Sequence, residues 1–184
     1  MDFTRTETQV AVAEAVAGAL TTAAPAEELL TALPSRGVDE AGFDERLWTA
    51  FAESGLLSLG LPAALGGDDL TPADIAVVLE EVGRAGVVIP ALETFGLGVL
   101  PIVSLGTAEQ QKRLLSGIED GRILTAALAE PGSPLPLEPT VRLDGGKLTG
   151  TTTSVRYAAQ SRSVLVAGST SEGAVVVCGV PDAP

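Results

Sequence analysis

The spacing of apolar residues changes near residue 121, and this change limits the fold more than any other feature of the sequence. Before it, apolar side chains recur three or four positions apart, as on one face of a helix; Val12, Val16 and Leu20 are an example. After it, apolar runs are short and end at glycine or proline, which is typical of strands joined by turns. The sequence therefore predicts helices followed by a sheet.

Six segments of the first part are predicted to be helical. Thr71 precedes Pro72 as an N-cap, and Thr107 stands three residues before Gln110 in a capping box. Gly55 follows the third segment, at a position where helices favour glycine. The predicted helices cover residues 4–23, 26–33, 43–54, 72–85, 91–105 and 107–118.

The second part is predicted to be a sheet, because four prolines between residues 131 and 139 exclude a regular helix there. Asp144-Gly145-Gly146 is predicted to turn one hairpin, and residues 169–173 a second. So few strands leave open edges, and we expect further strands or a partner to complete the sheet. The predicted strands cover residues 123–128, 140–143, 147–153, 163–167 and 174–180.

These elements predict an α+β fold class. An N-terminal all-α helical domain would occupy residues 1–120, and the first part of an antiparallel β-barrel-like domain would occupy residues 121–184.

Composition excludes several classes of function. A net charge of −13 would repel a phosphate backbone, so we expect no nucleic-acid partner. The absence of histidine excludes Ser-His-Asp and Cys-His catalysis within this chain, and no metal site is predicted. Cys178 is single and is expected in the core, which favours a cytoplasmic location. No apolar stretch is long enough for a membrane span, and the first residues lack a signal-peptide pattern.

A series of short motifs runs along the chain in a fixed order. Leu79-Glu-Glu-Val-Gly-Arg-Ala85 resembles the "EELGRA" helix of the acyl-CoA dehydrogenases, and Ala126–Gly132 resembles their "TEP" passage. Each motif is short, but their shared order makes the resemblance to this family specific. The other passages that carry it are Trp48–Leu57, Leu59–Pro62 with Gly66-Gly67, Leu97–Pro101 with Gly106–Lys112, Ile118–Gly121 and Leu148–Gly150.

The resemblance implies a helical N-terminal domain and a middle β-domain that binds FAD. It also implies a C-terminal four-helix domain, which is absent from this sequence. An acyl-CoA thioester would be the substrate, an electron-transfer flavoprotein the electron acceptor, and the protein a homo- or hetero-oligomer. By their motif positions, the residues at the FAD would be Leu128, Ala129, Ser133, Ser154 and Arg156. Those lining the acyl pocket would be Gly98, Val99 and Ile102.

The sequence departs from the family pattern at the positions nearest to the flavin. Ala129 lacks the hydroxyl of the family's threonine, Ser154 replaces a tryptophan ring, and Thr152 replaces a lysine. The family's catalytic base is a glutamate of the C-terminal domain, so no catalytic residue is assigned in this chain. Glu130 belongs to the "TEP" passage and is predicted to be a structural hydrogen-bonding group.

Three hypotheses follow. The first is a subunit or fragment of an acyl-CoA dehydrogenase, which catalyses FAD-dependent α,β-dehydrogenation with a base from outside this chain. The second is a non-catalytic structural or binding subunit of a heteromeric acyl-CoA dehydrogenase. The third is an unrelated helical scaffold without a sheet after residue 121.

Overall fold

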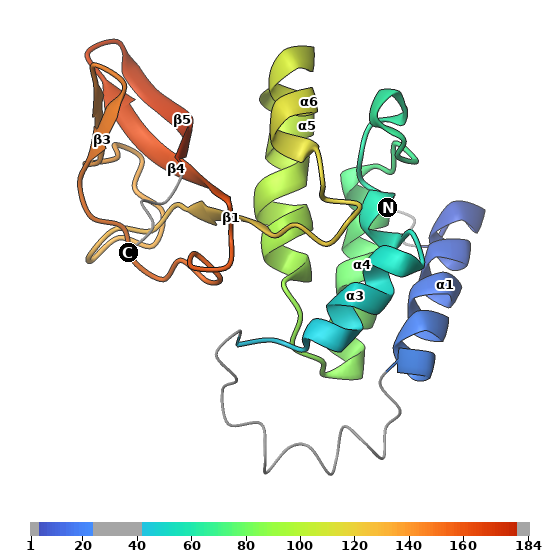
Figure 1. Ribbon diagram of the computed structural model, residues 1–184. Coiled ribbons are helices and arrows are strands. Elements are labelled where there is room, and N and C mark those ends of the chain that lie inside the picture. Colours follow the sequence, from blue (N-terminus) through green and yellow to red (C-terminus); the bar gives the residue numbers. More distant parts are fainter. Residues whose placement is uncertain (1–3, 24–41, 180–184) are drawn as a thin grey trace.

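The computed structural model describes residues 4–23 and 42–179, which form a helical part followed by a sheet (Figure 1). The α+β fold class is thereby confirmed, and the hypothesis of a purely helical scaffold is wrong. The predicted helix at residues 26–33 lies outside the described residues, as does the side chain of Cys178. Among the helices of the described segments, none has both the length and the apolar character needed to cross a bilayer.

The helices begin where the sequence predicts caps. Thr71 accepts a hydrogen bond from the Asp74 N–H, and Thr107 accepts one from the Gln110 N–H. In both cases the side chain three positions later bonds back to the cap, so two N–H groups are satisfied at each start. The described helices are α1 (Glu7–Ala23), α3 (Glu45–Glu53), η1 (Leu56–Ser58), η2 (Ala63–Leu65), α4 (Pro72–Ala85), η3 (Leu92–Val99), α5 (Leu100–Leu105) and α6 (Ala108–Leu115).

The core of the helical part lies between α1, α3, α4 and η3. Phe51 and Phe95 are fully buried in it. Trp48 is buried as well, and its Nε1–H donates to the Gly121 carbonyl at 2.8 Å. Trp48 therefore anchors α3 to the segment that leads into the sheet.

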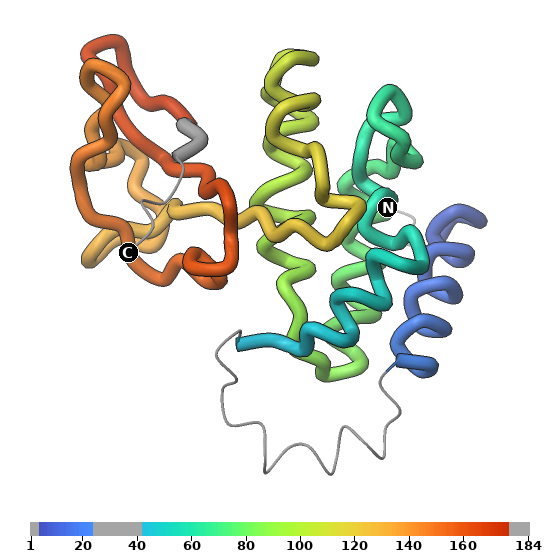
Figure 2. Tube along the Cα trace, viewed as in Figure 1, coloured from blue at the N-terminus to red at the C-terminus, as the bar shows by residue number. Residues whose placement is uncertain are grey.

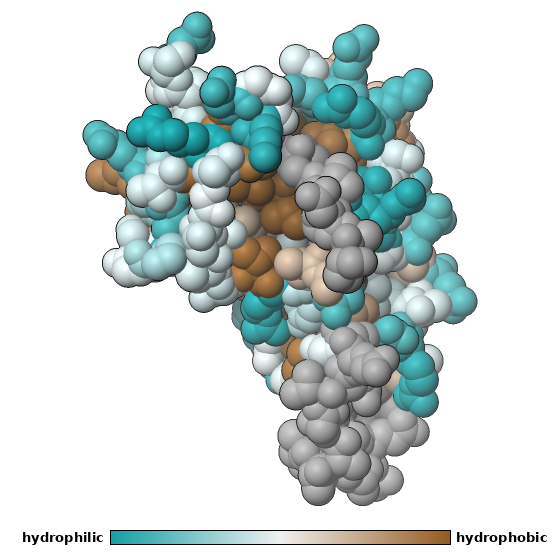
Figure 3. All heavy atoms as spheres, turned by 60° about the vertical axis from the view of Figure 1, so that its left-hand side comes forward, coloured by the Kyte–Doolittle hydropathy of each residue, from teal (hydrophilic) through white to brown (hydrophobic). Residues whose placement is uncertain are grey.

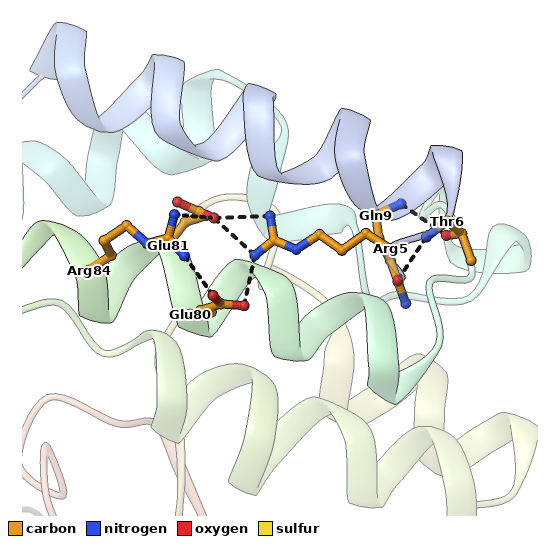
Figure 4. Close-up of polar contacts among 6 residues, drawn as sticks. All are labelled: Arg5, Thr6, Gln9, Glu80, Glu81 and Arg84. Carbon is orange, nitrogen blue, oxygen red and sulfur yellow. Dashed lines mark hydrogen bonds and ion pairs between the residues drawn. The ribbon is translucent and has the colours of Figure 1, made fainter. Parts of the chain in front are cut away.

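An ion-pair network fastens the start of α1 to α4 (Figure 4). Arg5 Nη2 lies 2.7 Å from Glu80 Oε2 and 3.3 Å from Glu81 Oε1. Arg84 approaches the same two carboxylates from the next turn of α4, at 2.6 Å from Glu80 and 3.7 Å from Glu81. The paired guanidinium groups lower the pKa of Glu80, with Arg5 making the largest contribution. Glu81 is the buried member, so this network gives a partner to a carboxylate that is largely shielded from water.

Residues 92–99 form a π-helix, η3, where the sequence predicts an ordinary α-helix. The Leu100 N–H donates to the Phe95 carbonyl, five residues earlier. Pro101 follows and has no N–H with which to bond the Leu97 carbonyl, so the usual α-helical ladder cannot continue there. Such π segments are rare, and hydrophobic periodicity does not predict them.

Gly98 lets η3 lie directly against the first strand, β1 (Leu124–Ala127). A Cβ atom at position 98 would lie 2.7 Å from Leu124 Cγ, which is closer than two carbon atoms can approach. Leu124 is itself fully buried, so it has little room to move aside. Figure 2 shows the chain leaving α6 and entering β1 beside these helices.

Five strands form one open sheet within the described residues. β1 pairs with β4 (Ser163–Thr170) in parallel, from Leu124 opposite Ser163 to Ala127 opposite Val166. β5 (Gly173–Gly179) pairs with β4 in antiparallel orientation. The sheet is therefore mixed rather than wholly antiparallel, and it is not closed into a barrel. A long connection separates β1 from β4, which is the condition for parallel pairing; strand periodicity alone does not reveal the partner.

The two predicted hairpins are confirmed. Gly145 and Gly146, with φ of 55° and 80°, join β2 (Arg142–Asp144) to β3 (Lys147–Thr149). Two successive positive φ angles define the turn that suits the twist of a two-residue hairpin. β4 and β5 are joined at residues 170–173. The strand predicted at 147–153 is shorter in the structure, because β3 ends at Thr149.

The contact at Gly98 predicts a stability effect. Gly98→Ala should destabilise the chain by about 1–3 kcal/mol, because the added methyl group overpacks Leu124. Gly83→Ala is the matched control: it lies in α4 with no atom within 4 Å of the new methyl group, and it should stabilise by up to about 1 kcal/mol. Urea unfolding measures both changes, and equal effects at the two positions would contradict this packing.

Candidate functional site

The structure brings together the two segments that are predicted to contact the flavin. Ala129 and Thr153 form an isolated antiparallel bridge, in which the Thr153 N–H donates to the Ala129 carbonyl at 2.9 Å. Leu128 and Ala129 are half-buried on one side of this bridge, and Ser154 is exposed on the other. The Ala129 carbonyl therefore already accepts one hydrogen bond within the protein.

Ser133 closes a tight turn that starts at Glu130. The Glu130 and Ser133 backbones exchange two hydrogen bonds of 2.9 Å each. Pro131 and Gly132 occupy the centre of the turn, which is a favoured sequence for such a geometry. Ser133 is thus held near Ala129 by the backbone, and its predicted role at the cofactor stays a prediction.

The carboxylate of Glu130 fixes the chain on the far side of the proline-rich loop. It accepts hydrogen bonds from the Thr140 N–H and Oγ1–H, both at 2.7 Å, and from the Val141 N–H at 3.2 Å. The bond from the Thr140 hydroxyl is the main reason that the pKa of Glu130 lies below its usual value. A general base needs the opposite shift. Glu130 is therefore a structural hydrogen-bonding group, as the sequence predicts.

The backbone around residue 156 adopts an uncommon conformation. Ser154 and Tyr157 have φ of 57° and 56°, in the left-handed region that residues with side chains rarely occupy. Tyr157 is held there by a T-shaped contact with Phe43, with ring centroids 5.5 Å apart. The Ser161 hydroxyl donates to the Tyr157 carbonyl at 2.8 Å. Several contacts therefore keep this segment in a strained geometry.

Arg156 makes an ion pair with Glu93, a residue that the sequence interpretation did not single out. Arg156 Nε lies 3.0 Å from Glu93 Oε1, and Nη2 donates to the Tyr157 hydroxyl at 3.0 Å. The guanidinium also lies over the Tyr157 ring, 5.3 Å from its centroid. The Tyr157 hydrogen bond is the main cause that raises the pKa of Arg156. The side chain of Glu93 is only 6% exposed, whereas that of Arg156 is 64% exposed. A buried carboxylate is therefore paired with a guanidinium that lies at the surface.

One sequence signal could have revealed Glu93. It is the only charged residue between Arg84 and Glu109, in a segment that is otherwise apolar or uncharged. A charge on the buried side of such a segment needs a partner. Its partner, however, lies in a distant part of the chain, and the sequence does not identify it.

The residues predicted to line an acyl pocket lie in the core of the helical part. Val99 is fully buried and Ile102 is 5% exposed, while Gly98 faces Leu124. A ligand that touches these residues must therefore enter between core side chains. Figure 3 shows apolar atoms gathered in a recess on one face of the molecule, with hydrophilic atoms above it and on its left. Surfaces of this kind are commonly covered by an apolar ligand or a partner.

The residues at the predicted flavin positions do not fit a bound FAD well. A flavin needs an apolar cover and a few well-placed donors. Ser154 offers no ring for stacking, and Ala129 offers no hydroxyl. The guanidinium of Arg156 is held by Glu93 and Tyr157.

Comparison with known proteins identifies relatives over most of the chain. Residues 6–122 match a family model described as acyl-CoA dehydrogenase, N-terminal domain. Acyl-CoA dehydrogenase FadE28 of Mycobacterium tuberculosis (strain ATCC 25618 / H37Rv) is 47% identical over 130 residues, which are 71% of this chain and 38% of the relative. Acyl-CoA dehydrogenase FadE27 of the same strain is 33% identical over 179 residues, 96% of this chain and 46% of the relative. The chain therefore spans less than half the length of these curated relatives.

Solved structures share the fold. The Tcur3481-Tcur3483 steroid ACAD G363A variant has a TM-score of 0.82 and 32% identity, over 97% of this chain and 49% of that chain. The ChsE4-ChsE5 complex from Mycobacterium tuberculosis has a TM-score of 0.81 and 30% identity, over 98% and 49%. An acyl-CoA dehydrogenase complexed with FAD from Bacillus anthracis has a TM-score of 0.69 and 26% identity, over 94% and 31%.

The contacts of Glu130 predict a dependence of stability on pH. Because its pKa is lowered on folding, its contribution is complete above the pKa of the unfolded chain and is lost as the pH falls through the folded value. Glu130→Gln should therefore be less stable than the natural chain at neutral pH, and the difference should shrink as the pH falls below about 4.3. Urea unfolding at a series of pH values measures this. Glu138→Gln, at an exposed position of the same loop, is the control, and an identical pH profile for both variants would contradict the assignment.

Proposed function

Because the chain belongs to the acyl-CoA dehydrogenase family, we propose that it is a subunit, or part of one, of an assembly that dehydrogenates an acyl-CoA thioester. The proposed reaction is FAD-dependent α,β-dehydrogenation. The single observation that carries the proposal is the match of the helical part to the family, combined with the fold of its sheet. The substrate, the acceptor and the partners are part of this proposal, since the chain spans less than half of its curated relatives.

The base that removes the α-proton is proposed to come from outside this chain. Glu130 is engaged by Thr140 and Val141, and Glu93 is engaged by Arg156. The hydrogen bonds to Glu130 lower the pKa of that carboxyl, which is the opposite of what a general base needs. The carboxylate of Glu93 is buried against the guanidinium of Arg156. The helical part would contribute the acyl-pocket wall, through Gly98, Val99 and Ile102.

We propose a hetero-oligomer as the assembly. Two of the structural neighbours carry two-component names, Tcur3481-Tcur3483 and ChsE4-ChsE5, and the second is described as a complex. An electron-transfer flavoprotein is the proposed acceptor of the electrons. The steroid description of one neighbour supports the inclusion of a steroid acyl-CoA among the substrates to be tested.

A second candidate function is that of a non-catalytic subunit in such an assembly. The contacts of Arg156 favour it, because a guanidinium paired with Glu93 stands where the family places a flavin-contacting residue. Ala129 and Ser154 add to this, since both lack the group that the family lays against the flavin. In this version, the partner subunits provide the complete active sites.

Flavin bleaching tests the proposed function. The chain should be purified with its natural continuation or partner subunit, and the flavin absorbance recorded as a fatty or a steroid acyl-CoA is added. We expect at least one acyl-CoA to bleach the flavin of the assembly, whereas free CoA, which has no acyl group to oxidise, should not. Absence of bound flavin and of bleaching in every assembly would contradict the proposal.

The flavin stoichiometry of the same assembly separates the two candidates. The non-catalytic version predicts fewer FAD molecules than copies of this chain plus its partner. One FAD for every subunit, counting both this chain and its partner, would contradict that version and favour a catalytic subunit.

A further inference from the structure

The loop at residues 153–157 and the π-helix η3 belong to different parts of the fold, and Arg156 joins them. Arg156 follows the bridge that ties Thr153 to Ala129 in the sheet part. Glu93 lies in the first turn of η3. Their 3.0 Å contact therefore links the predicted flavin-contacting loop to the helix that is predicted to line the acyl pocket.

Both ends of this link are held in place by neighbouring groups. Glu93 is buried on η3, whose position is set by the close contact of Gly98 with Leu124. On the other side, Arg156 donates to the Tyr157 hydroxyl, and the Tyr157 ring packs against Phe43 of the helical part. The link is thus one hydrogen-bonded group of residues and not a single surface contact.

The chemistry of this cluster opposes a flavin at the same place. A flavin ring requires an apolar or aromatic face, and a guanidinium held beside a buried carboxylate offers neither. To admit the flavin, Arg156 would have to swing away and leave Glu93 buried without a partner. Such an unpaired buried charge is strongly unfavourable.

We infer that the Glu93–Arg156 ion pair takes the place of a bound flavin in this chain and joins the sheet to the helical part without a cofactor. This inference rests on the proposed function, because that function supplies the positions at which the family places its flavin and acyl group. Arg156, which stands at a flavin-contacting position of the family, would then have a structural role of its own. In this inference, the ion pair holds the sheet part against η3 although no flavin is bound there.

A double-mutant cycle on the full chain tests whether the Glu93–Arg156 ion pair stabilises the contact between the two parts. Arg156→Met leaves Glu93 buried and unpaired, and it should raise the unfolding equilibrium constant by roughly tenfold or more. Glu93→Gln keeps the shape but removes the charge, so Arg156→Met added to Glu93→Gln should have a much smaller effect than it has alone. Arg162→Met, at an exposed arginine of the same region, is the control and should change little. Additive effects of the two substitutions would overturn the inference.

An FAD titration gives the second readout, which does not depend on the variants being stable. The natural chain should show no saturable quenching of flavin fluorescence and no rise in melting temperature with FAD. Saturable binding of one FAD per natural chain would overturn the inference. That outcome would not contradict the proposed function. The absence of bleaching in every assembly would contradict the proposed function, but it would not contradict the stabilising role of the Glu93–Arg156 ion pair.

Discussion

The arrangement of this chain depends on the close contact between the π-helix η3 and strand β1. Gly98 allows the two to touch, because any side chain at that position would occupy the space of Leu124. β1 then pairs with β4, and β4 carries β5, so the orientation of the sheet follows from where β1 leaves the helical part. Gly98, in the π-helix η3, thus sets how closely the helical part and the sheet approach each other.

The polar cluster around Arg156 strengthens the same junction from the other side. Glu93 reaches it from η3, and Tyr157 reaches it from the loop that follows the sheet hairpin. The Gly98–Leu124 packing contact and the Glu93–Arg156 ion pair both involve η3. Loss of either contact should therefore weaken the junction between the helical part and the sheet. We propose that these two contacts together hold the arrangement of helices and sheet that this chain shares with its structural neighbours.

The sequence predicts those features that depend on neighbouring residues. Thr71 and Thr107 mark helix starts because a cap needs only the next turn, and Gly145-Gly146 marks a hairpin because the turn needs only its own backbone. The parallel pairing of β1 with β4 and the pairing of Glu93 with Arg156 join distant segments, so local patterns do not reveal them. The π-helix escapes prediction for another reason: its apolar spacing resembles that of an α-helix. The flavin-site positions came from the resemblance, and the contacts of Arg156 came only from the structure.

We infer that residues of this chain, and not a cofactor, hold the sheet loop against η3. Amide hydrogen exchange of residues 153–161 tests it most directly, when measured on the natural chain with and without FAD. We expect these amides to be protected in the absence of FAD, and we expect FAD to leave their exchange rates unchanged. Rapid exchange without FAD, followed by protection when FAD is added, would contradict it.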